Sequence, residues 1–203
     1  MDERAAMSGK SVQTGSSTDR RSARTRRMLH QALMQLIVSK DYESITVQDL
    51  IDEADIGRST FYAHYAGKDD LLRQGFEHLR AELGSAEKPG GVSEPLAFSA
   101  AMFVHAERYK DIYRALVGSR GNGIVLAEIR KVLLDRVLKD LGNFAAPDVP
   151  KELMARFLVD SFQSVLTWWL ERRPKLSAGE IDTIFRNMLG PTLRSVSGSA
   201  AHR

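Results

Sequence analysis

Apolar residues recur every three to four positions along most of the 203-residue chain, the spacing of one face of an α-helix. The pattern predicts an all-α fold with helices over 46–54, 58–65, 68–83, 95–109, 112–117, 124–141, 150–173 and 177–193, preceded by a longer helix that Thr18 or Asp19 caps. The stretches 1–17 and 196–203 are poor in large apolar residues, so we expect a disordered leader and a disordered tail. The glycine-rich stretch 118–123 is expected to be a loop.

The stretch from Thr46 to Tyr65 predicts two short helices joined by a tight turn. Asp49 follows Thr46 by three residues, so the two can cap each other in a capping box at the start of the first helix. Asp55 and Gly57 suit the turn, because both accept backbone conformations that most residues avoid. This order is typical of a helix-turn-helix, whose second helix enters the DNA major groove, although two short helices of an ordinary core have the same periodicity.

The segment from Arg24 to Leu72 resembles the DNA-binding domain of the TetR/AcrR family of bacterial transcriptional regulators. The family's recognition helix usually reads Arg-x-Thr-Phe-Tyr-x-His-Phe, and this chain has Arg-Ser-Thr-Phe-Tyr-Ala-His-Tyr over 58–65 and then the family-like Lys-Asp-Asp-Leu-Leu over 68–72. Asp41, Asp55 and Gly57 depart from the usual Gly, Gly and Ser, but turns and helix caps accept the residues present. The resemblance implies a helix-turn-helix DNA-binding domain over 18–66 and a larger helical domain over 67–195 that binds an effector and dimerises.

Two groups of residues are candidates for contacting double-stranded DNA. Residues at the start of the second short helix can reach base edges, and those near its end meet phosphates. Arginines at the start of the first helix oppose its dipole, so phosphate or minor-groove contacts explain them better than helix stability does, with a solvated basic face as the alternative. The DNA-binding candidates are Arg58, Ser59 and Thr60 for bases, Tyr62, His64 and Lys68 for phosphates, Thr46 and Tyr65 beside them, and Arg24 and Arg26 in the first helix.

The helix expected over 150–173 has apolar residues around most of its circumference and only a narrow polar strip. One buried face needs an apolar arc only a little over 100° wide, so a second face must be covered by a partner. The resemblance implies that the last two long helices pair with their copies in a homodimer, and a monomer with a thick core is the alternative. The interface candidates are Phe162, Leu166, Trp169, Ile184, Phe185 and Met188.

The resemblance also implies a small-molecule pocket among the middle helices. Polar groups in apolar surroundings need partners, so His105 and Tyr113 are stronger candidates than the apolar residues, which could equally be core. Ionisable residues are not clustered there, which favours a largely apolar effector. The pocket candidates are Phe98, Met102, His105, Tyr109, Tyr113, Phe157 and Trp168.

Composition narrows the function classes further. The chain has no cysteine, and its five histidines are scattered without metal-ligand spacing, so we expect no thiol catalysis, no metal, no cofactor and no enzyme activity. No apolar run approaches the roughly 20 residues that span a bilayer, and we expect a cytoplasmic protein without a membrane partner. The expected function is a homodimeric repressor that a small, largely apolar effector releases from a palindromic operator. The alternative is a DNA-binding dimer without an effector, in a protein-interaction or activator role.

Overall fold

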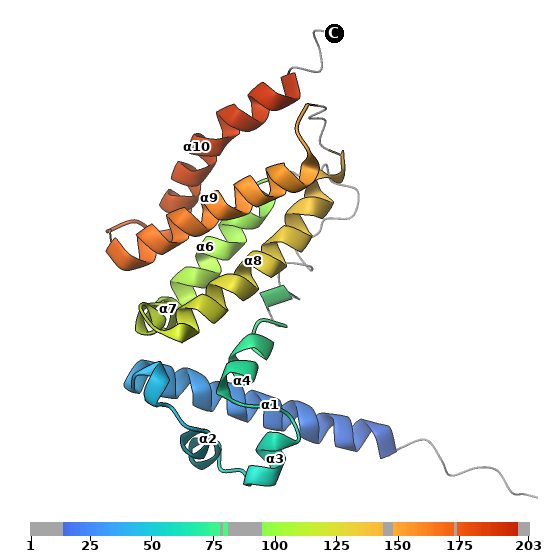
Figure 1. Cartoon of the computed structure of the whole chain (residues 1–203), viewed down its shortest axis with the longest axis vertical. Coiled ribbons are helices and arrows are strands. Elements are labelled where there is room, and N and C mark those ends of the chain that lie inside the picture. The colour runs from blue at the N-terminus through green and yellow to red at the C-terminus, as the bar shows by residue number, and fades with distance from the viewer. Residues whose placement is uncertain (1–13, 78, 81–94, 144–147, 173, 199–203) are drawn as a thin grey trace, which may run out of the picture.

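The computed structural model describes residues 14–77, 79–80, 95–143, 148–172 and 174–198, and these residues form helices joined by turns (Figure 1). The described segments contain no strand, so the predicted all-α class is confirmed. None of their helices is long and apolar enough to cross a membrane. The α-helices are α1 Thr14–Ser39, α2 Val47–Glu53, α3 Arg58–Tyr62, α4 Lys68–Gln74, α6 Ala97–Arg108, α7 Lys110–Leu116, α8 Arg120–Asp140, α9 Lys151–Arg172 and α10 Ala178–Gly198, with short 3-10 turns η1 Tyr42–Ser44 and η2 Leu141–Asn143.

The first and last helices are longer than the apolar pattern predicted. α1 begins at Thr14, so the expected leader is wrong for 14–17 and otherwise lies outside the described residues. α10 continues through Pro191 to Gly198, so the expected tail is wrong for 196–198, and its remainder again lies outside the described residues. Apolar spacing marks only the part of a helix that packs against something, and it gives no signal where a helix continues into solvent.

Helices α1 to α3 pack into a small domain at the N-terminal end of the chain together with α4, which the sequence had assigned to the larger domain. Figure 1 shows α1 lying across this domain with α2 and α3 on one side of it and α4 leading toward the other helices. α1 contacts both α2 and α4, and α2 contacts α3. Leu33, Leu50, Phe61 and Leu71, one from each helix, are almost fully buried between them. Burial of these side chains fixes the angle at which α3 leaves the domain surface.

The larger domain packs α8 along α9 and α6 along α10. Its centre is a cluster of aromatic rings: the rings of Phe103 and Phe162 lie 4.8 Å apart, and Phe98 and Phe185 lie within 6.3 Å of each other in the same cluster. Tilted and edge-to-face aromatic pairs add to the free energy of burial. The aromatic cluster is the centre of the larger domain, and its buried residues continue into those of the N-terminal domain in one core.

Two helix boundaries near glycines differ from the predicted ones. The helix expected over 68–83 is interrupted after Gln74 by a turn at Gly75, where a Cβ atom would lie 2.7 Å from Nε2 of His30. The expected loop over 118–123 is wrong for 120–123, because α8 begins at Arg120, whereas 118–119 lie outside a helix and Gly118 has a left-handed backbone (φ +83°). Gly121 is helical and closely packed, since a Cβ there would lie 2.6 Å from Leu116. Both glycines allow close approach between helices.

Candidate nucleic-acid interface and interdomain cavity

The N-terminus of α2 is held by the predicted capping box. The hydroxyl of Thr46 accepts a hydrogen bond from the amide of Asp49 at 3.1 Å, and the carboxylate of Asp49 accepts one from the amide of Thr46 at 2.7 Å. The ammonium of Lys40 lies 2.8 Å from the same carboxylate. The hydrogen bonds from Lys40 and then from Thr46 lower the pKa of Asp49 below its ordinary value. This cap fixes where α2 begins relative to α1.

The turn between α2 and α3 has the predicted left-handed residue. Asp55 has φ +50°, and Gly57 is the extended residue immediately before α3. The guanidinium of Arg58 donates to the side-chain oxygen of Gln48 at 3.0 Å, which links the first turn of α3 to α2. Gln48 is exposed beside Arg58. It was not among the predicted site residues, because the link between the two side chains exists only once the turn has folded.

α3 separates its residues into an exposed face and a buried face. Arg58, Ser59 and Tyr62 are exposed, and 52% of the Tyr62 side chain is accessible to solvent. Thr60 and His64 are half-buried at the edge of this face. The exposed face combines a guanidinium and hydroxyl groups, which are the groups that hydrogen-bond to base edges and phosphates.

Tyr65 differs from the other candidates because its side chain is buried. It packs against Phe61, with ring centroids 6.0 Å apart, and burial raises the pKa of its hydroxyl. The DNA contact expected of Tyr65 is therefore not supported by its position. The family motif has an aromatic residue here, and in this chain that residue anchors α3 to the core.

Lys68 is also engaged within the protein. Its ammonium donates to the backbone carbonyls of Tyr42 at 2.6 Å, Glu43 at 3.0 Å and Ile45 at 2.8 Å. The same ammonium lies 4.7 Å from the centre of the Tyr42 ring. An ammonium group has three N–H donors, and the carbonyls of the η1 turn accept them all. The phosphate contact expected of Lys68 is not supported by this geometry, and its side chain joins α4 to the connection between α1 and α2.

The remaining DNA-binding candidates lie on α1. Arg24 and Arg26 are exposed, and the guanidinium of Arg26 donates to the hydroxyl of Ser22 at 3.0 Å. Figure 1 shows the N-terminal part of α1 extending past α3, on the side of the small domain away from α7. A basic helix end that projects beside an exposed recognition helix can contact the phosphates that flank a major groove.

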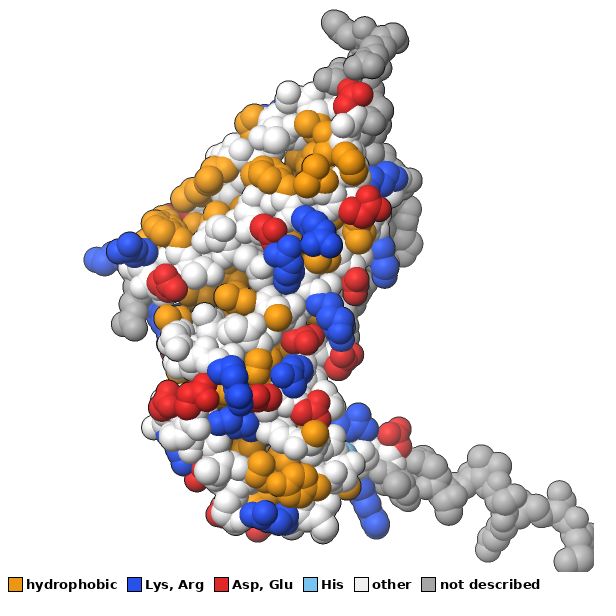
Figure 2. Space-filling view, viewed as in Figure 1, with side chains coloured by type: hydrophobic (Ala, Val, Ile, Leu, Met, Phe, Trp, Pro, Cys, Tyr) orange, Lys and Arg blue, Asp and Glu red, His pale blue; other side chains and the backbone are white. Residues whose placement is uncertain are grey.

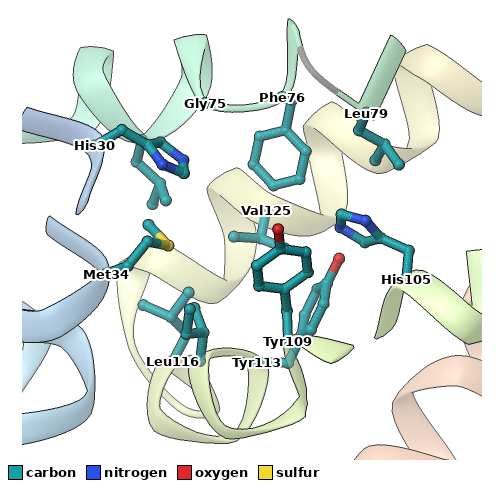
Figure 3. Close-up of a pocket in the computed structure, with 12 residues that line it drawn as sticks. His30, Met34, Gly75, Phe76, Leu79, His105, Tyr109, Tyr113, Leu116 and Val125 are labelled. Atoms are coloured by element: carbon teal, nitrogen blue, oxygen red, sulfur yellow. The ribbon is translucent and has the colours of Figure 1, made fainter. Parts of the chain in front are cut away.

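A cavity of about 80 Å³ lies between the two domains (Figure 3). α1 and α4 contribute one side of it, and α6, α7 and α8 contribute the other. Among the predicted pocket residues, His105, Tyr109 and Tyr113 line it, whereas Phe98 and Met102 belong to the buried core. The full lining is His30, Met34, Leu72, Gly75, Phe76, Leu79, His105, Tyr109, Ile112, Tyr113, Leu116 and Val125.

The hydroxyl of Tyr113 is buried at this cavity. Only 6% of the residue is exposed, and its Oη has no hydrogen-bond partner among the described residues. Burial raises the pKa of this hydroxyl, so it stays protonated at neutral pH. Figure 3 shows the hydroxyls of Tyr109 and Tyr113 both directed toward the part of the cavity where Phe76 and His105 lie.

The apolar surface that α9 and α10 expose in the structure differs from the predicted interface. Phe162, Leu166, Trp169 and Phe185 are buried within the chain's own core and cannot meet a partner in this conformation. Ile184 and Met188 are exposed as expected. Three residues of α9 join them on the surface, and two of these had been assigned to the pocket: Leu153, Phe157 and Trp168 are 58%, 45% and 46% exposed.

These exposed apolar side chains lie on two helices that contact each other, α9 and α10. Figure 2 shows hydrophobic side chains gathered over α9 and α10 in the upper half of the molecule. The polar strip of α9 faces elsewhere: Asp160 pairs with Arg130 of α8, and the amide of Gln163 donates to the carbonyl of Leu126 at 2.6 Å. The second face of α9 that the sequence predicted is therefore apolar and open to solvent in the single chain.

Family models match both domains. Residues 29–74 match the model described as bacterial regulatory proteins, tetR family, and residues 93–190 match one described as transcriptional regulator C-terminal region. An uncharacterized HTH-type transcriptional regulator of Bacillus subtilis, YxbF, is 41% identical over 66 residues, which cover 32% of this chain and 17% of that protein.

Solved structures resemble most of the chain, across both domains. A TetR transcriptional regulator from Streptococcus agalactiae is 28% identical with a TM-score of 0.60, covering 87% of this chain and 99% of that one. The dihydroxyacetone kinase operon activator DhaS has a TM-score of 0.65 at 20% identity, covering 85% of this chain and 98% of that one. NalD, the secondary repressor of the MexAB-OprM multidrug efflux pump in Pseudomonas aeruginosa, has a TM-score of 0.60 at 15% identity, covering 87% and 98%. The last two likenesses concern the fold alone.

Proposed function

Because this chain belongs to the TetR family of bacterial regulatory proteins, a family of DNA-binding transcriptional regulators and not of enzymes, we propose that it is a homodimeric repressor released from its operator by a small molecule. The observation that carries the proposal is the exposed face of α3. A capped α2 and a tight turn present Arg58, Ser59 and Tyr62 to solvent, while Phe61 anchors the helix from behind. This is the arrangement that a helix-turn-helix requires to enter a major groove.

The contacts divide between bases and phosphates. Arg58, Ser59 and Thr60 lie in the first turn of α3 and contact base edges in this proposal. Tyr62 and His64, near the end of the helix, contact phosphates together with Arg24 and Arg26 of α1. Thr46 is exposed at the start of α2 and stays a candidate for a phosphate contact, although its hydroxyl also bonds to Asp49 in the capping box.

The dimer is proposed from the open apolar face of α9 and α10. Leu153, Phe157, Trp168, Ile184 and Met188 are exposed on adjoining helices, and a second copy of the same face buries them symmetrically. Each protomer of the dimer carries one α3. Two such helices fit successive major grooves when they are about 34 Å apart, which requires a palindromic operator.

Effector control is proposed from the position of the cavity. Its lining comes from both domains, with His30 and Met34 on α1 and Tyr113 on α7. A molecule bound there contacts the DNA-binding domain directly. Release from DNA follows if the molecule has higher affinity for a conformation in which the two α3 helices no longer match the groove spacing, since a ligand shifts an equilibrium only by its differential affinity.

Fluorescence anisotropy tests the proposal. Labelled DNA from upstream of the protein's own gene and a scrambled duplex of equal length are titrated over a series of salt concentrations. We expect the upstream DNA to bind at least about 1,000-fold more tightly than the scrambled DNA, with an affinity that falls steeply as salt rises. Equal and weak binding of both duplexes contradicts the proposal.

A further inference from the structure

The cavity between the domains has a chemistry that restricts what it can bind. Among the described residues that line it, the side chains are mostly aliphatic or aromatic, and none is Asp, Glu, Lys or Arg. A charged molecule would lose its hydration there without meeting a fixed opposite charge, which is costly. The lining therefore favours an uncharged molecule.

Three of the four polar side chains that line the cavity, His105, Tyr109 and Tyr113, lie together on one side of it, and His30 of α1 lies on the other (Figure 3). The rings of His105 and Tyr109 lie 4.7 Å apart, and the ring of Tyr113 lies 6.4 Å from that of His105. Of these, Tyr113 has a buried hydroxyl with no hydrogen-bond partner among the described residues. Leaving such a group unsatisfied costs free energy, and a bound molecule with one hydrogen-bonding group recovers it.

The size of the cavity limits the molecule as well. One water molecule needs roughly 10–15 Å³ of free cavity volume, and this cavity has about 80 Å³. The space therefore holds roughly five to eight water-sized groups. A single six-membered ring with one substituent has about this size.

We propose that the cavity binds a small, uncharged, single-ring molecule with one hydrogen-bonding group, and that the hydroxyl of Tyr113 is the residue that recognises this group. The inference rests on the effector-binding part of the function proposed above. Tyr113 is then the specificity-determining residue: the apolar walls select for size, and the hydroxyl selects for a polar substituent over an apolar one of equal shape.

Isothermal titration calorimetry on the full chain without DNA tests this inference. The probes are phenol, toluene and benzoate. Phenol and toluene have nearly the same shape, but phenol has a hydroxyl group where toluene has a methyl group. Benzoate carries a charge at neutral pH. Each probe is titrated into the wild-type protein, into Tyr113→Phe and into the control Thr192→Val, which removes the hydroxyl of an exposed residue of α10 that does not line the cavity. A thermal unfolding curve for each variant establishes that it is folded.

We expect phenol to bind the wild type, and Tyr113→Phe to weaken phenol by about tenfold while toluene binds equally well or better. Thr192→Val leaves both affinities unchanged, and benzoate binds at least tenfold more weakly than phenol. Unchanged phenol affinity in Tyr113→Phe, benzoate binding as tightly as phenol, or no binding of phenol and toluene to the wild type overturns the inference. If phenol binds as expected but does not alter DNA affinity, the ligand class stands and the effector part of the proposed function fails.

Discussion

The guanidinium of Arg120, at the start of α8, lies 2.7 Å from the carboxylate of Asp69, in the first turn of α4. The hydroxyl of Tyr42 donates to the same carboxylate at 2.8 Å, and the backbone amide of Arg120 donates to the carboxylate of Glu43 at 2.9 Å. These contacts join the DNA-binding domain to the larger domain. They lie at the N-terminal end of α4, the helix that comes directly after α3. They are therefore placed to set the orientation of α3 relative to the exposed apolar face of α9 and α10.

Arg120→Ala and Tyr42→Phe test whether the contacts act as a unit. Arg120 is largely exposed, so its loss lowers the free energy of unfolding by less than about 1 kcal/mol. The buried hydroxyl of Tyr42 contributes about 1 kcal/mol. Because both act on Asp69, the double variant differs from the sum of the single variants by about 0.5 kcal/mol or more in urea unfolding. Strict additivity would show that the two contacts are independent.

Gly121→Ala introduces a methyl group into a closely packed contact. Its Cβ would lie 2.6 Å from Leu116 and 3.1 Å from the ring of Tyr42, so we expect a loss of about 1–3 kcal/mol in the free energy of unfolding. Gly123→Ala in the same helix is the matched control, since nothing lies within 4 Å of its added Cβ. It should stabilise the protein by about 0.5–1 kcal/mol through helix propensity. Equal effects of both substitutions in thermal or urea unfolding would contradict this packing.

The capping box makes stability depend on acid pH. The folded-state pKa of Asp49 lies below its ordinary value of 3.8, so the carboxylate contributes stability above pH 3.8 that is lost as pH falls toward the folded pKa. Asp49→Asn lacks this titration. We expect the wild type to be more stable than the variant near neutral pH and the difference to shrink below about pH 4 in urea unfolding. A difference that stays constant from pH 7 to pH 3 would show that Asp49 does not titrate with this shift.

Trp168→Glu tests the dimer face. A charge in an apolar interface should weaken dimerisation by about 2 kcal/mol or more, roughly 30-fold in Kd. Val38 is an exposed valine on α1 outside this face, so Val38→Glu is the control and should leave the dimer intact. Sedimentation velocity over a concentration series measures both. A monomeric wild type, or a Trp168→Glu protein that dimerises as tightly as the wild type, would rule out this interface.

Thr60→Ala and Tyr62→Phe separate base reading from phosphate contact. Thr60→Ala should change the relative affinities for operator variants by roughly fivefold or more. Tyr62→Phe should weaken operator and non-operator DNA by a similar factor, because it loses a phosphate contact that carries no sequence information. Titrations of each variant against a set of single-base operator changes distinguish the two. A uniform loss for Thr60→Ala would contradict its assignment to a base edge.

Local features of this fold could be predicted, because their causes lie within a few residues. The capping box needs only Thr46 and Asp49, and the left-handed turn needs only Asp55. Contacts between distant segments could not be predicted. Lys68 matches a family position that suggested phosphate binding, and only the folded chain shows the three carbonyls of the η1 region that accept its N–H groups.

The same limit applies to the apolar surfaces. Trp168 and Trp169 are adjacent and both apolar, and periodicity established that α9 has two apolar faces without deciding which of them the chain covers. In the structure Trp169 is 7% exposed and its indole donates to the carbonyl of Leu176, while Trp168 is 46% exposed. His30 on α1 reaches the cavity through the packing of α1 against α4 and α7, for which its neighbours in sequence give no signal.

Footprinting of the upstream DNA fragment tests the central claim, that a dimer places two α3 helices in successive major grooves. We expect one protected site made of two inverted half-sites whose centres are about 10 base pairs apart. Arg58→Ala should weaken both halves equally, because the same residue reads each of them. A site without two-fold symmetry, or protection that Arg58→Ala leaves unchanged, would contradict the claim.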